Sequence, residues 1–213
     1  MIEENSGKFF RFKLDFNFGF GFAEVYDFRD ISSFDGTKVF VYNRIDSKSL
    51  KLYYESEITS SGIALGPISL YKYPNSRGIG AWKFLFKTNK YIIEEPPVAK
   101  DALDLAPWKY DWSILEKWHK SDRDSRSQLI YMPYENVRSF ETLIVNSNVS
   151  VVKKATMKFI IDNGKKVQDY YNLYDLGNVN MFIQLVNTYY SLERCRELIK
   201  DVPPMKEILK RKN

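Results

Sequence analysis

Hydrophobic and polar residues alternate strictly over thirteen positions near the start of the chain. Phenylalanine or leucine occupies every second position from Phe10 to Phe22, and the positions between them carry charged residues, asparagine or glycine. A period of two places alternate side chains on opposite faces of a β-strand. Because strands usually run about 5–6 residues, we expect the chain to bend or turn near residues 17–21, where Gly19 and Gly21 permit sharp coiling.

Further short apolar runs predict more strands in the N-terminal half, at residues 24–28, 38–43, 50–55, 68–73 and 82–86. Twenty of the 34 aromatic residues precede residue 92, and large rings fill the core of a small sheet efficiently. The pattern therefore predicts a curled, barrel-like antiparallel sheet in this half.

The second half has a different pattern. Residues 155–162 and 165–172 are apolar-rich runs separated by Asn163-Gly164, the dipeptide that best tolerates a type I′ turn, so a β-hairpin is predicted. Apolar residues at helical spacing then predict one helix after residue 178, with Asn178 as its cap, and another after Ser191.

These patterns indicate an α+β protein. The composition changes at Glu94-Glu95-Pro96-Pro97, where two prolines favour a connector. We predict a β-rich region over residues 1–95 and a mixed region over 96–213, with a hairpin and C-terminal helices, that packs on the first as one unit.

Several classes of protein are not expected. The first residues are acidic and polar, which does not fit a secretory signal peptide, and no run approaches the roughly 18 apolar residues of a membrane span. Cys195 is the only cysteine, so an intrachain disulfide is impossible and a reducing, cytoplasmic location is expected.

Catalytic motifs are missing from the sequence. It contains no phosphate-binding loop, dinucleotide fingerprint or serine nucleophile elbow. His119 and Cys195 could form a nucleophilic pair, but Cys195 shares an apolar helix face with Leu192 and Leu198, where a thiol acts as a small hydrophobic group. We therefore predict no enzyme, no catalytic residue, no metal site and no cofactor.

The net charge of +5 is modest, and residues 200–213 supply much of it, with five basic and two acidic residues. Nucleic-acid binders usually spread basic residues over one face. Aromatic residues near the middle of the chain are better candidates for binding a partner, because tryptophan and tyrosine are common anchors in protein interfaces. These candidate partner-binding residues are Trp108, Tyr110, Trp112 and Trp118.

Two segments also resemble a known family. Residues 7–14 (GKFFRFKL) and 18–25 (FGFGFAEV) are similar to the opening strands of the immunity protein 26 family, and the resemblance covers roughly residues 7–90. Members of this family belong to bacterial polymorphic toxin systems, in which the immunity protein protects the producing cell. The family has no catalytic residue to carry over.

The resemblance implies a protein that binds and neutralises a cognate toxin by occlusion. The expected partner is that toxin; neither a membrane nor nucleic acid is expected. A nucleic-acid-binding β-barrel module is the alternative, since exposed aromatic rings interleaved with lysine or arginine would stack on bases. The oligomeric state is not predicted.

Overall fold

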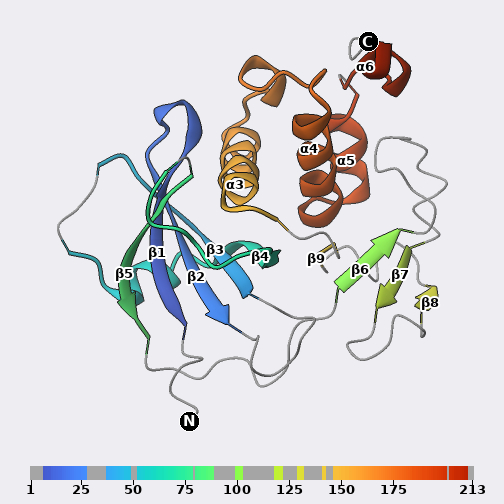
Figure 1. The fold of residues 1–213 in the computed structure, drawn as a ribbon. Coiled ribbons are helices and arrows are strands. Elements are labelled where there is room, and N and C mark those ends of the chain that lie inside the picture. Colours follow the sequence, from blue (N-terminus) through green and yellow to red (C-terminus); the bar gives the residue numbers. More distant parts are fainter. Residues whose placement is uncertain are drawn as a thin grey trace. The chain divides into compact units, whose positions relative to one another are not determined.

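The computed structural model describes residues 7–27, 37–48, 52–78, 80–88, 99–102, 118–121, 129–131, 141–142, 146–200 and 202–210. The chain divides into two compact units, one made of residues 1–97 and 144–156 and the other of residues 98–143 and 157–213. A sheet in the N-terminal half and helices near the C-terminus confirm the α+β class (Figure 1). How the predicted regions 1–95 and 96–213 pack together stays a prediction.

The first unit contains a five-stranded antiparallel sheet in the order β4-β3-β2-β1-β5. Its strands are β1 (Lys8–Lys13), β2 (Phe20–Asp27), β3 (Thr37–Asp46), β4 (Ile63–Leu70) and β5 (Trp82–Lys87). The sheet is curled but not closed, so β4 and β5 are its two edge strands. This confirms the predicted sheet, without closure into a barrel.

The long alternation in the sequence is divided between β1 and β2 by a tight turn. Phe16 and Asn17 there have positive φ angles of 55° and 58°, and the Leu14 amide donates to the Gly19 carbonyl oxygen at 2.9 Å. Gly19 has a φ of +116°, and a Cβ at this position would lie 2.5 Å from the Asp46 carbonyl oxygen. The expected turn is therefore present, centred slightly earlier than residues 17–21.

The strand predicted at residues 50–55 is wrong. Residues 52–54 form no regular element, and a short helix, α1 (Glu55–Thr59), follows them. β3 is paired on one side with β2 and on the other with β4. Residues 50–55, which follow β3 in the chain, therefore cannot form a strand beside it. The segment instead places Tyr53 and Ile58 in the core and leaves Leu52 exposed.

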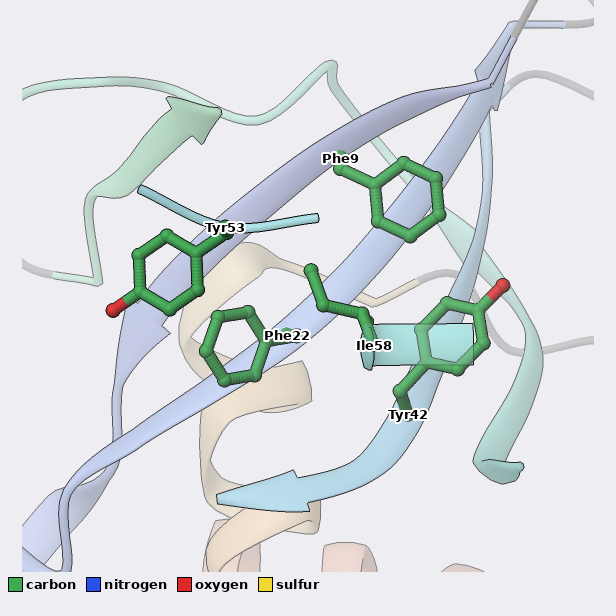
Figure 2. Close-up of a cluster of buried hydrophobic side chains, with 5 residues drawn as sticks. All are labelled: Phe9, Phe22, Tyr42, Tyr53 and Ile58. Carbon is green, nitrogen blue, oxygen red and sulfur yellow. The ribbon is translucent and has the colours of Figure 1, made fainter. Parts of the chain in front are cut away.

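Both faces of the sheet carry buried aromatic side chains. One face, here the α3 face, carries Phe10, Phe12 and Trp82. The other, the α1 face, carries Phe9, Phe22 and Tyr42, which cluster with Tyr53 and Ile58 (Figure 2).

Helix α3 (Asn148–Asp162) contributes its first residues to the unit that contains the sheet. The Asn148 side-chain amide donates to Asn75 Oδ1 at 2.7 Å, and the Thr156 hydroxyl accepts from the Asp15 amide at 3.2 Å. The helix therefore runs from the segment before β5 to the turn between β1 and β2. Figure 2 shows it behind the strands, away from the α1-face cluster.

The hairpin predicted around Asn163-Gly164 is also wrong. Residues 155–162 belong to α3, and residues 165–172 contain only a 3₁₀ turn, η4 (Val167–Asp169). The Gly164 amide donates to the Ile161 carbonyl and the Lys165 amide to the Ile160 carbonyl, with Gly164 at a φ of +69°. This is a Schellman cap, which needs a glycine at positive φ just as a type I′ turn does, so the dipeptide did not distinguish the two.

The second unit contains a small sheet in the order β8-β7-β6-β9, in which β6 and β9 are parallel. Its strands are β6 (Ala99–Ala102), β7 (Trp118–Ser121), β8 (Leu129–Tyr131) and β9 (Glu141–Thr142). The same unit holds α4 (Leu176–Tyr189), α5 (Leu192–Leu198) and α6 (Met205–Lys210).

The two predicted helix starts have different outcomes. The Ser191 hydroxyl accepts from the Arg194 amide, which confirms Ser191 as the cap of α5. Asp175, and not the predicted Asn178, caps α4, because its carboxylate accepts from the Asn178 amide at 2.8 Å. An N-cap oxygen reaches a backbone amide two or three residues later, so the prediction identified the amide donor instead of the cap.

Candidate functional site

Most of the predicted partner-binding residues lie outside the described part of the chain. This applies to Trp108, Tyr110 and Trp112. Trp118 is the first residue of β7 and pairs through its backbone with Ala102 of β6. The role of these four residues stays a prediction.

Cys195 is fully buried in α5. Its thiol donates to the Val186 carbonyl oxygen at 2.8 Å, which matches the sequence-based view of this thiol as a core group. A thiol buried in this way is inaccessible to a substrate. His119, the other member of the discarded pair, lies in β7, where its backbone pairs with Asp101 and Tyr131.

The described residues contain no group of three or more His, Cys, Asp or Glu side chains able to hold a metal ion. Within the same residues, no helix combines the length and the hydrophobicity needed to cross a membrane.

The α1 face encloses a carboxylate that the sequence pattern did not place in the core. Glu24 is only 3% exposed and accepts from the Tyr26 and Tyr42 hydroxyls, both at 2.7 Å. Burial, and then the hydrogen bond to Glu24, raises the pKa of both tyrosines. Gly7 leaves room for the carboxylate, because a Cβ there would overlap Glu24 Oε1. Each carboxylate oxygen has a hydroxyl donor, so the buried carboxylate is satisfied within the protein.

Two arginines also pack against rings on this face. Arg11 is 9% exposed; its guanidinium lies 4.6 Å from the centre of the Phe20 ring and donates to the Tyr53 hydroxyl at 3.2 Å. Arg44 lies over the Phe22 ring at 5.5 Å and pairs with Asp46 at 3.0 Å, and its hydrogen bond to the Asp46 carboxylate raises the pKa of Arg44. Both guanidinium groups thus have partners within the protein.

One exposed surface of the first unit lies along β5, at one edge of the sheet. Phe84 is 50% exposed and its ring contacts Phe10 edge-on at 5.7 Å. Phe10 also contacts the Tyr73 ring at 5.9 Å, and the Lys8 ammonium lies over that ring at 5.3 Å. Lys87 is exposed and pairs with Lys8, so their side chains share one face. We call these residues the β5-edge surface: Lys8, Tyr73, Phe84 and Lys87.

The segment of the chain that contains β5 carries charge of one sign. Residues 58–93 contain five basic residues and no acidic one. Four of the five, Lys72, Arg77, Lys83 and Lys87, are described and exposed. The net charge of +5 therefore comes from this segment and the C-terminal residues 200–213, while the rest of the chain is slightly acidic. The absence of aspartate and glutamate over these 36 residues can be read from the sequence. The charge of residues 200–213 alone does not reveal it.

Comparison of the chain with protein-family models, with curated proteins and with solved structures finds no match.

Proposed function

We propose that this chain binds a cognate toxin protein and neutralises it by covering its active site or substrate channel, as the resemblance to the immunity protein 26 family implies. The observation that carries the proposal is the β5-edge surface, where a half-exposed phenylalanine and lysines lie on a well-packed sheet. Aromatic anchors with charged neighbours are typical of protein interfaces.

Binding is favoured over catalysis by the way the buried polar groups are used. The Glu24 carboxylate accepts from two tyrosine hydroxyls, and the Cys195 thiol donates to a backbone carbonyl. Both groups are directed into the protein and are satisfied there. The exposed groups along β5, by contrast, are directed outward, where a partner can reach them.

Occlusion needs no chemistry from the inhibitor. A specific interface covers about 800 Å² on each partner, enough to block a substrate channel. The uneven charge adds an effect on rate, because complementary potentials steer partners together and exclude others. A toxin with an acidic region would therefore associate with the basic β5-edge surface faster than a toxin with a neutral region.

A nucleic-acid-binding module remains the second candidate. One observation favours it: lysines and aromatic rings lie together, with Lys8 over Tyr73 and Lys72 over Tyr71 at 5.5 Å. Single strands bind to such platforms through stacking and phosphate contacts. Only part of the platform is accessible, however, because Phe10 and Trp82 are buried beneath it.

The deciding experiment is affinity capture of the tagged protein from its native cells, at low and at high salt, with the bound material identified by mass spectrometry. We expect one near-stoichiometric protein that stays bound at high salt and whose toxicity disappears on co-expression with this chain. Nucleic acid released by salt, without a protein partner, would contradict the proposal, because phosphate-dominated binding falls steeply with salt.

A further inference from the structure

We infer that the outer edge of β5 accepts an acidic, extended segment of the partner protein as an added strand of the sheet. This inference rests on the proposed function and specifies how the partner is held. It follows from three features of β5: its position at the sheet edge, the direction of its backbone groups, and the charge around it.

The two edge strands of the sheet differ in their capacity to pair. β4 contains Gly66 and Pro67, and proline has no amide hydrogen to donate to a neighbouring strand. β5 has the sequence WKFLFK, with neither glycine nor proline. In the described part of the chain, β5 has a paired strand on the β1 side only. An edge of this kind is a template for an added strand.

The backbone of β5 also points the right groups outward. The Trp82 amide faces away from β1, because it donates to the Asn75 carbonyl oxygen at 2.9 Å. Backbone groups two residues apart in a strand point the same way, so the amide and carbonyl of Phe84 are directed to the outer edge. The irregularity in the β1–β5 register lies just beyond Phe84. The half-exposed Phe84 ring offers an apolar contact at the same position.

The charge selects the incoming segment. Lys83 pairs with Arg11 and Lys87 with Lys8, so lysines flank the β5 edge on both faces of the sheet. No acidic residue occurs between Glu57 and Glu94. Lysines on an edge strand discourage pairing with neutral or basic strands, whereas acidic side chains on the incoming strand would turn this repulsion into attraction.

The test uses three fluorescent ten-residue peptides as probes for the full chain. One alternates glutamate and valine, one alternates lysine and valine, and one is the glutamate peptide with proline at its central valines. In fluorescence anisotropy, the glutamate peptide should bind saturably below about 1 mM and the proline version at least about tenfold more weakly, while the lysine peptide should not bind.

Matched variants locate the binding site. Phe84→Glu and Ile63→Glu each place a charge at an exposed apolar residue, at 50% and 56% exposure, but on opposite edge strands. Lys83→Glu and Lys48→Glu each reverse one exposed charge. We expect the β5 variants to weaken peptide binding about tenfold or more and the other two to change it less than about twofold.

Each contrary result overturns the inference. Equal binding of the two glutamate peptides would show attraction by charge alone, and equal effects of the β4 and β5 variants would place the site elsewhere. If the glutamate peptide does not bind saturably, or if a single-stranded oligonucleotide binds more tightly, the inference of an added strand at β5 is wrong. If a captured toxin binds the β5 and β4 variants equally well, the proposed function stands and this inference fails. If the peptide binds at β5 but the cells yield no protein partner, the β5 edge still accepts an added strand and the proposed function fails.

Discussion

In the first unit, the α3 face of the sheet is closed by apolar side chains, whereas the α1 face encloses a carboxylate and a guanidinium. Phe12 and Trp82 stack at 5.0 Å on the α3 face. On the α1 face, Phe9 lies in the same layer as Glu24 and Arg11, both of which are almost completely buried. Side chains are thus buried on both faces of the sheet, by ring stacking on the α3 face and with hydrogen-bonded charged groups on the α1 face.

The difference shows what the tyrosines contribute. Burying a charge is costly unless it is fully hydrogen-bonded. A tyrosine supplies both an apolar ring and a hydroxyl, so Tyr26 and Tyr42 pack in the core and also satisfy Glu24. The α1 face therefore buries charged groups that depend on hydrogen bonds, whereas Phe12 and Trp82 on the α3 face pack as stacked rings.

The largest expected effect is on the α3 face. Trp82 is fully buried, so Trp82→Ala should lower the free energy of unfolding by about 3–5 kcal/mol, the usual cost of removing a large buried ring. Urea unfolding followed by circular dichroism measures this change.

Phe84→Ala is the matched control, because Phe84 is on the same strand and face but half exposed. Its loss should stay below about 1.5 kcal/mol, since half of the ring is already in water. Comparable losses for the two variants would contradict a closed core beneath Trp82.

The next effect tests the α1 face. Glu24→Gln keeps the shape but replaces one acceptor oxygen with an amide donor, so the hydroxyl hydrogen of one tyrosine loses its acceptor. We expect a loss of about 1–3 kcal/mol in the free energy of unfolding, the cost of a mismatched buried polar group.

A double-mutant cycle sharpens this prediction. Tyr42→Phe removes one donor to Glu24, so in the Glu24→Gln background it should cost less than in the original protein. Additive losses would show that the Tyr42–Glu24 hydrogen bond contributes no coupling energy.

The sequence predicted elements well where one rule governed them. Strict alternation gave β1 and β2, and Ser191 gave the start of α5. The pattern failed where two structures share a requirement: Asn163-Gly164 provides the positive φ of a Schellman cap as well as that of a hairpin turn. It also failed at residues 50–55, because nothing local shows that both sides of β3 are occupied.

The burial of the polar groups on the α1 face could not be predicted from the alternation within one strand. Alternation assigned Arg11 to a polar face, and its burial depends on Tyr53, 42 residues later in the chain. The candidate surface was only partly accessible to sequence reasoning: the charge of residues 58–93 can be counted, but the exposure of Phe84 depends on the order of the strands.

The smallest effect is on pH dependence. Burial and the hydrogen bond to Glu24 raise the pKa of Tyr42 above its ordinary value of 10.0. Above that pH the unfolded tyrosine loses its proton while the folded one keeps it, so stability is full below pH 10 and falls as the pH rises. The loss from pH 8 to pH 11 should be about 1.4 kcal/mol for each such tyrosine.

Tyr42→Phe should therefore reduce the alkaline loss by about 1.4 kcal/mol, measured by urea unfolding at pH 8 and at pH 11. If Tyr42→Phe left the alkaline loss unchanged, Tyr42 would hold its proton no better in the folded protein than in the unfolded chain. The hydrogen bond to Glu24 would then contribute nothing to keeping the proton on Tyr42, while the packing of the α3 face would be unaffected.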